Sequence, residues 1–124
     1  MAGGLTISTL NDSSGVLATQ NGMTGISKAW LCYNGTTQTI LGSFNVSSVT
    51  RNGTGDYTMN FTTAMPNANY AVAGMARNND NNNDTYIVQM QLSSTKTTSA
   101  FQFTARENGG TGQDTPECDV VVFR

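Results

Sequence analysis

The feature that most constrains the fold is an alternation of apolar and polar residues on both sides of a glycine-rich segment. It runs through residues 44–47 and again through residues 56–62. A period of two is typical of a strand with one buried face. Between the two runs, residues 52–55 (NGTG) supply the glycines and the asparagine that a tight turn uses. The sequence therefore predicts a β-hairpin whose strands are Thr39–Thr50 and Asp56–Thr62.

Charge and hydrophobicity together predict the register of this hairpin. A four-residue loop places Val46 opposite Phe61 and Arg51 opposite Asp56, so one pairing satisfies both the apolar face and an ion pair. After the hairpin, Pro66 has no N–H for a β-ladder. We therefore expect the second strand to end before Pro66 and a new strand to follow.

Similar alternation, separated by turn residues, recurs along residues 28–124, and no segment there has helical spacing. The predicted strands are 29–33, 39–50, 56–62, 69–77, 86–92, 101–106 and 120–123. This pattern predicts an all-β fold, an antiparallel, jelly-roll-like β-sandwich of about seven to eight strands. Its predicted core includes Phe44, Val46, Met59, Phe61, Val72, Val88, Phe101 and Phe103.

Residues 1–27 have scattered apolar residues without helical spacing or long alternation. We expect them to form an extended arm outside the domain of residues 28–124. Leu5, Ile7 and Leu10 could add a short strand to another protomer or to the protein that carries the domain. The alternative is a flexible N-terminal segment that contacts nothing.

The last predicted strand, Val120–Phe123, is apolar on both faces, and residues 70–76 and 86–88 are so in part. A strand of this kind is expected to be covered twice, by the core and by a neighbouring subunit. The interface of such an oligomer is predicted to contain Trp30, Val121 and Phe123.

Composition excludes several classes of function. Six Lys or Arg residues against eight Asp or Glu residues give a net charge of −2, so no basic surface for nucleic acid is expected. The first ten residues contain neither a signal peptide nor a membrane span, and we expect no membrane partner. With no His and two Cys, the chain has no zinc site and no Ser-His-Asp or Cys-His nucleophile.

No other chemistry is indicated. The carboxylates of residues 78–117 lie in polar loops, which we expect to be mobile, whereas catalytic groups need rigid supports. We expect no enzyme activity, no cofactor and no metal. Cys32 and Cys118 fall in the first and last predicted strands, which are often neighbours in a sandwich, so a disulfide is conceivable. Two buried free thiols are the prediction.

Five short segments carry a family resemblance: AWLCYNGT (29–36), FNVSSVT (44–50), NGTGDYT (52–58), NFTTAMPNANYAV (60–72) and VVVFR (120–124). Together they resemble the C-terminal domain of tail-fibre and short-appendage proteins of tailed bacteriophages, especially those of marine bacteria and cyanobacteria. The resemblance implies a homotrimeric virion protein that assembles in the cytoplasm of the bacterial host. Residues 1–27 would then bind another virion protein.

Two functions are compatible with this resemblance. The first is a knob that attaches the particle to a glycan or protein on the host-cell surface. The second is a purely structural virion component, such as a head fibre, capsid decoration or baseplate protein, that binds no receptor. The resemblance supports both, because the family is defined by its scaffold.

If the knob contacts a host, its polar loops at residues 78–84 and 107–117 are the expected contact surface. The candidate contacts are Asn79, Asp80, Asn82, Asp84, Asn108 and Gln113. A simple up-and-down count of strands places both loops at the end where the arm enters and the turn at 35–38 at the other end. An arm that folds back along the domain, a Greek-key crossover or strands lying across the trimer axis would remove this conflict.

Overall fold

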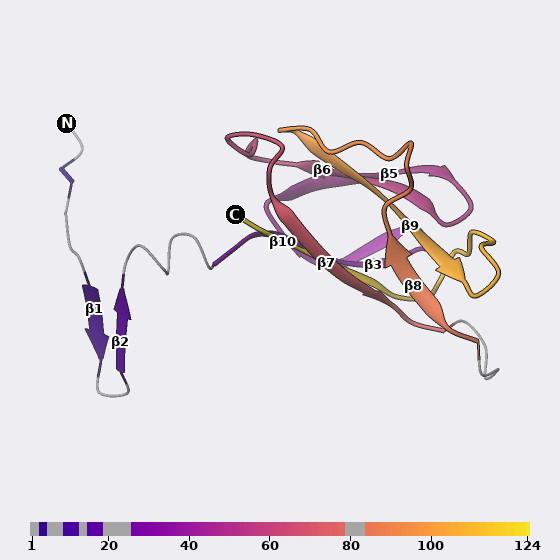
Figure 1. The fold of residues 1–124 in the computed structure, drawn as a ribbon, viewed down its shortest axis with the longest axis horizontal. Coiled ribbons are helices and arrows are strands. Elements are labelled where there is room, and N and C mark those ends of the chain that lie inside the picture. Colours follow the sequence, from indigo (N-terminus) through magenta and orange to yellow (C-terminus); the bar gives the residue numbers. More distant parts are fainter. Residues whose placement is uncertain (1–2, 5–8, 13–14, 19–25, 79–83) are drawn as a thin grey trace.

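The computed structural model describes residues 3–4, 9–12, 15–18, 26–78 and 84–124. Eight of its strands form two four-stranded antiparallel sheets that pack face to face, and none of the described residues is helical (Figure 1). This confirms the predicted all-β sandwich. β1 (Thr9–Asp12) and β2 (Gly15–Ala18) pair with each other as a separate two-stranded sheet.

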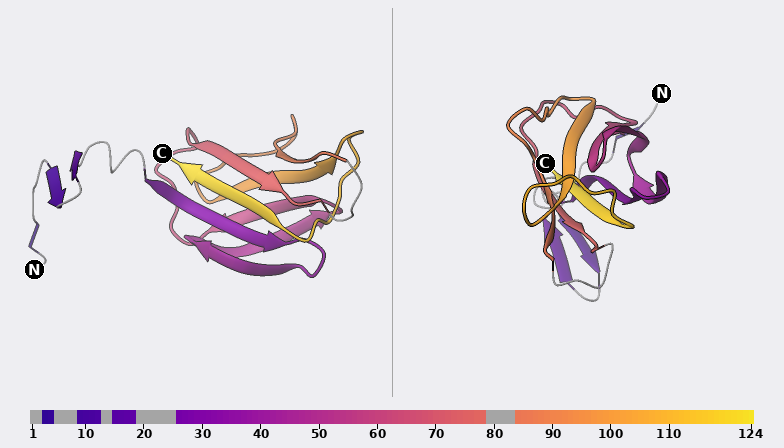
Figure 2. Two further views of the ribbon diagram at one scale, coloured as in Figure 1. Left: turned by 90° about the horizontal axis from the view of Figure 1, so that it is seen from below. Right: turned by 90° about the vertical axis from the view of Figure 1, so that its right-hand side faces the viewer.

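The first sheet has the strand order β4-β3-β10-β7. It consists of β3 (Ser27–Asn34), β4 (Thr39–Phe44), β7 (Ala71–Ala76) and β10 (Cys118–Phe123). The first strand of the sandwich and the last are therefore neighbours, as expected from the sequence. Figure 2 shows β10 lying between β3 and β7.

The second sheet has the strand order β5-β6-β9-β8. It consists of β5 (Val46–Gly53), β6 (Asp56–Phe61), β8 (Tyr86–Gln89) and β9 (Ala100–Glu107). β7 and β8, the edge strands of the two sheets, lie against each other along one side of the sandwich.

Alternate residues of the central strands fill the core. Six aromatic rings contact one another in a continuous series that runs from Tyr33 through Tyr57, Phe103, Phe101 and Tyr70 to Phe61. Of the eight predicted core residues, Met59, Phe61, Phe101 and Phe103 are buried, and Val46, Val72 and Val88 are partly buried and pack against the core. Phe44 is the exception, with 54% of its surface exposed.

A reversal of the chain at Asn45 explains why Phe44 is exposed. Residues 39–50 were predicted as one strand, but β4 ends at Phe44 and β5 begins at Val46 in the opposite sheet. Asn45 has a φ of 56°, a left-handed conformation that Asn tolerates better than most residues. Its side-chain amide donates to the carbonyls of Lys28 (3.0 Å) and Thr63 (3.1 Å), and its side-chain oxygen accepts from the Thr63 amide (2.7 Å).

The hairpin register is confirmed in its apolar part and wrong in its charged part. Val46 does lie opposite Phe61, but Arg51 lies opposite Tyr57, and Gly53 lies opposite Asp56. The difference arises because the turn has two residues between the strands instead of four. Two register shifts, one between Arg51 and Gly53 and one between Val46 and Ser48, then offset the shorter turn, so that the predicted pair is restored only at Val46 and Phe61.

The bonds of Asn45 predict how its substitution affects stability. Asn45→Ala removes three hydrogen bonds and leaves a β-carbon at a left-handed position, so it should lower the free energy of unfolding by about 2–3 kcal/mol. Asn45→Gly removes the same bonds but tolerates the backbone angle, and it should lose about 1 kcal/mol less than Asn45→Ala. Urea unfolding followed by circular dichroism measures both. If Asn45→Ala unfolds within about 0.5 kcal/mol of the wild type, the side-chain bonds do not hold the corner.

Candidate functional site

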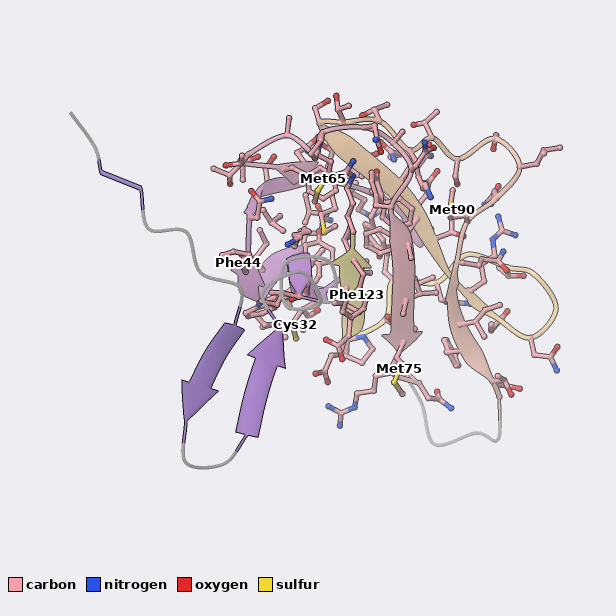
Figure 3. All side chains as sticks on the ribbon, turned by 60° about the vertical axis from the view of Figure 1, so that its left-hand side comes forward. Cys32, Phe44, Met65, Met75, Met90 and Phe123 are labelled. Atoms are coloured by element: carbon pink, nitrogen blue, oxygen red, sulfur yellow. The ribbon has the colours of Figure 1, made fainter. Side chains whose placement is uncertain are left out.

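The most unusual surface of the sandwich is the side of the first sheet that faces away from the core. We define the outer face by seven apolar residues that point outward from its four strands: Trp30, Phe44, Ala71, Ala73, Met75, Val121 and Phe123. Trp30 is 41% exposed and Met75 is 74% exposed. Figure 3 labels Phe44, Phe123 and Met75 on this side, together with Cys32.

The strand register explains why these residues form one surface. Val121 of β10 lies opposite Trp30 of β3 on one side and opposite Ala73 of β7 on the other, and Trp30 lies opposite Phe44 of β4. One row across the sheet is therefore apolar in all four strands. In the next row, Asp119 lies between Cys32 and Met75.

An open hollow of about 460 Å³ lies in the middle of the outer face. The small side chain of Ala73 leaves room in it, while Trp30 and Met75 are among the larger residues that line it. A contiguous apolar surface with a hollow is typical of a protein-binding site. The predicted interface residues Trp30 and Val121 line the hollow, and Phe123 lies farther along β10.

The outer face of the second sheet differs in chemistry. Amide side chains bridge its strands: Asn60 donates to Ser48 and Thr50 (3.1 Å each), and Gln102 donates to Asp56 (3.0 Å). A face whose polar groups are hydrogen-bonded to one another is stable in water. The outer side of the second sheet is therefore mainly polar, with Ile87 of β8 exposed at its margin, whereas the outer face of the first sheet is mainly apolar.

Cys32, Glu117 and Asp119 form a small cluster at the margin of the hollow, with ligand atoms within 4.8 Å of one another. Burial, the Asp119 carboxylate and Glu117 raise the pKa of the Cys32 thiol to about 12. The thiol is therefore protonated at neutral pH, in which form it is a poor metal ligand. Three donors are also fewer than the four of a structural zinc site.

The two cysteines are free, and the register explains why. Cys118 lies opposite Tyr33, whereas Cys32 lies opposite Asp119, so the two thiols point to opposite faces of the sheet. Cys118 is buried as predicted, but Cys32 is partly exposed on the outer face.

The second candidate surface is the end of the sandwich that contains the turns 35–38 and 54–55, residues 84–85 and the loop 108–117, which we call the tip. Backbone bonds join these segments: Gly35 donates to Thr115 (2.9 Å), Ala105 donates to Gly55 (2.8 Å) and Asn108 donates to Thr85 (2.9 Å). β3 begins at Ser27 at the opposite end, as Figure 1 shows.

The strand count made from the sequence is wrong about which turns share an end of the sandwich. The turn at 35–38 lies with the polar loops instead of opposite them, and the arm enters at the other end of the sandwich. The count treated residues 39–50 as one strand, whereas the chain reverses at Asn45 between β4 and β5. This extra reversal means that β3 and β4 run in the directions opposite to those that the count gave them relative to the later strands.

Asp114 holds the tip together. Its carboxylate accepts hydrogen bonds from Arg51 (2.6 Å), from the Gly55 amide (2.9 Å) and from the Tyr57 hydroxyl, and its backbone oxygen accepts from Thr36 (2.9 Å). Burial alone would raise the pKa of Asp114, but the bonds from Arg51, Gly55 and Tyr57 outweigh it and hold the pKa below its usual value. The loop 107–117, expected to be mobile, is thus fastened at Asp114.

The pairing of Arg51 with Asp114 differs from the one that the sequence predicts. Asp56, the predicted partner of Arg51, instead accepts from Asn52 (3.2 Å) and from Gln102 (3.0 Å). The pairing of Arg51 with Asp114 spans 63 positions of the chain, and no local pattern could indicate it. The small number of cationic residues was the one usable indication in the sequence. With six Lys or Arg residues in the chain, each acidic residue has few possible partners for an ion pair.

The structure places three of the six predicted receptor contacts at the tip. Asp84 and Asn108 are exposed and Gln113 is partly buried, with its backbone amide bonded to Ala105 (3.0 Å). The bond from Asn108 to Thr85 brings the two polar loops together. Asn79, Asp80 and Asn82 lie outside the described residues.

Among the described residues, no helix is long and apolar enough to cross a membrane. Comparison with known proteins finds no matching family model, no matching curated protein and no matching solved structure.

The bonds of Asp114 predict a pH-dependent loss of stability. Asn keeps an Oδ1 that can accept from the Gly55 amide and the Tyr57 hydroxyl, but it removes the carboxylate charge and places an NH2 group, which cannot accept, against the Arg51 guanidinium. Asp114→Asn should therefore lower the free energy of unfolding by about 1–3 kcal/mol at pH 7. Urea unfolding measures this loss, and Asp84→Asn, an exposed carboxylate at the same end, is the control.

The direction of the pH effect follows from the lowered pKa. The stabilisation from Asp114 is complete above the pKa of an unfolded Asp, about 3.9, and is lost as the pH falls through the lower pKa of the folded state. Wild-type stability should decline in that range, and Asp114→Asn should decline less. An equally steep decline in the variant would show that other carboxylates cause it.

Proposed function

We propose that this chain is a structural protein of a phage particle, a homotrimeric knob that assembles through its outer face and contacts the host-cell surface with its tip. The observation that carries the proposal is the outer face, because four strands align their apolar residues on a side that the core does not use. Small domains gain from association the burial that they cannot achieve alone. The number three comes from the resemblance to phage appendage proteins.

The orientation of the sandwich supports a role for the tip. β3 begins at Ser27, at the end opposite the tip, so a domain attached through residues 1–27 would carry the tip on its far side. Polar loops on a rigid scaffold are common recognition surfaces. Asp114 supplies the rigidity, and exposed groups such as Asp84 and Asn108 supply hydrogen-bonding groups for sugar hydroxyls or a protein surface. A trimer presents three tips, so it would bind a cell surface more firmly than a single copy would.

The second candidate function is a purely structural virion component. The outer face supports this structural function as well as it supports the attachment function, because assembly through that face needs no receptor. The two functions differ in whether the tip has a ligand outside the particle.

The proposed assembly predicts that the purified protein is a trimer at micromolar concentration. Val121→Glu places a charge in the centre of the outer face and should weaken association about 30-fold or more, because hot-spot residues near the centre of an interface are worth about 2 kcal/mol or more. Leu41→Glu is the control, since Leu41 is 57% exposed and does not line the hollow. Analytical ultracentrifugation measures the association. A wild-type monomer would refute the assembly.

The proposed attachment predicts that fluorescently labelled trimer binds to cells of the phage host. Asp84→Ala with Asn108→Ala should reduce binding without affecting assembly, because both side chains are exposed at the tip. Asn69→Ala, an exposed Asn at the opposite end, is the matched control. Flow cytometry measures binding, and gold-labelled antibodies locate the protein in the particle. Failure of the wild-type trimer to bind would favour the purely structural function.

A further inference from the structure

A second group of exposed apolar side chains lies on β8 and on the turn that follows it. Ile87 and Met90 are 43% and 45% exposed, and Leu92 is completely exposed. Figure 3 shows Met90 separated by β7 from Phe123, Cys32 and Phe44. The group therefore lies on a different side of the molecule from the outer face.

Leu92 projects from a closed turn. The Ser94 amide donates to the Gln91 carbonyl (3.0 Å), and the Gln91 amide donates to the Ser94 hydroxyl (3.0 Å). These two bonds fix residues 91–94, with Leu92 between them. A large apolar side chain is thus held in solvent by a defined backbone, which costs free energy unless something covers it. We call residues 90–94 the Leu92 turn.

This inference rests on the proposed homotrimer, in which three-fold symmetry relates the outer face of one copy to the Leu92 turn of another. A ring of three copies uses heterologous contacts, in which one patch of each copy meets a different patch of the next. Each copy therefore needs two apolar patches of different shape. The outer face offers a hollow of about 460 Å³, and the Leu92 turn offers a protrusion.

The positions of the two surfaces also suit a closed ring. β7 belongs to the first sheet and β8 to the second, and their side-by-side packing makes the outer face and the Leu92 turn adjacent sides of the sandwich. Two contact patches on adjacent sides turn each copy relative to the last and close a small ring. A heterologous contact whose rotation does not close builds an open filament instead.

The charges beside the two surfaces are complementary. Asp119 lines the hollow, is exposed, and forms no ion pair with the described residues. Arg106 lies opposite Ile87 in the sheet, and its guanidinium donates to the Gly110 carbonyl and to the side-chain oxygen of Gln91 in the Leu92 turn. Within the described part of the chain it forms no ion pair. When two copies meet, the Leu92 turn of one, with its Arg106, would therefore face the hollow of the other, with its Asp119.

We propose that the Leu92 turn of each copy inserts into the hollow of the outer face of the next copy. Leu92 then contacts Ala73, Met75 and Val121 of its neighbour, and Arg106 approaches the neighbour's Asp119. The occupant of the hollow is a second copy of this chain, and the contact repeats around the ring.

Disulfide trapping tests this contact directly. Met75 and Leu92 are each exposed, so both can become Cys without disturbing the core, and Cys32→Ser removes the native thiol that lines the hollow. The triple variant Cys32→Ser, Met75→Cys, Leu92→Cys should form covalent dimers and trimers under mild oxidation. The chain with Cys32→Ser and Leu92→Cys alone, and the chain with Cys32→Ser and Met75→Cys alone, should form neither.

The matched control is the variant Cys32→Ser, Leu41→Cys, Leu92→Cys. Leu41 is 57% exposed but does not line the hollow, so it should not form a bond to Cys at position 92. Equal trapping in this control would show that the bonds come from random collision and would overturn the contact.

The remaining outcomes separate this contact from the proposed assembly. If Leu92→Cys in the Cys32→Ser chain links to itself, two Leu92 turns meet across a two-fold axis, and the heterologous contact is wrong. If ultracentrifugation shows a trimer but the triple variant does not crosslink, the assembly stands and the contact is wrong. If the protein is a monomer, both are wrong.

Discussion

The hydrogen bonds of Asn45 are the constraint on which the arrangement of this sandwich depends. They join the chain reversal between β4 and β5 to the backbone at Lys28 and Thr63, which lie in different parts of the chain. Because of this reversal β4 and β5 belong to different sheets, and the polar loops lie at the end opposite Ser27. The same reversal turns Phe44 outward, where it completes the apolar row with Trp30 and Val121. One residue thus determines both the direction of the tip and the composition of the outer face.

The contrast between the two sheets gives the molecule a preferred side for association. In the second sheet, amide side chains such as Asn60 and Gln102 satisfy neighbouring hydroxyl and carboxylate groups across the strands. In the first sheet, the central strand β10 is apolar toward the core at Val120 and apolar toward solvent at Val121. Water solvates the hydrogen-bonded side chains of the second sheet well and the exposed apolar side chains of the first sheet poorly. A partner would therefore gain free energy by covering the outer face.

The tip combines exposure with fixed geometry. Tyr57, Arg51 and the Gly55 amide converge on Asp114, so the loop 107–117 is attached to the rigid end of the β5–β6 hairpin. Gly55 is needed there because its φ is 65° and because any β-carbon would collide with the backbone of Ala105 and Gln113. A loop that is fixed in this way can present its exposed side chains without a large loss of entropy on binding.

The sequence by itself determined the all-β class, the position of most strands and most of the core, because period-2 alternation reports directly which face of a strand is buried. It also indicated that Trp30, Val121 and Phe123 belong to one apolar surface, since a strand that is apolar on both faces needs two partners. Only the tertiary structure decided the break at Asn45, the pairing of Arg51 with Asp114 and the end at which the loops lie. Each of these depends on contacts between residues far apart in the chain: Asn45 bonds to residues 17 and 18 positions away, and Arg51 bonds to a residue 63 positions away. Alternation along a strand carries no information about such contacts, because it records burial and not the identity of the neighbour.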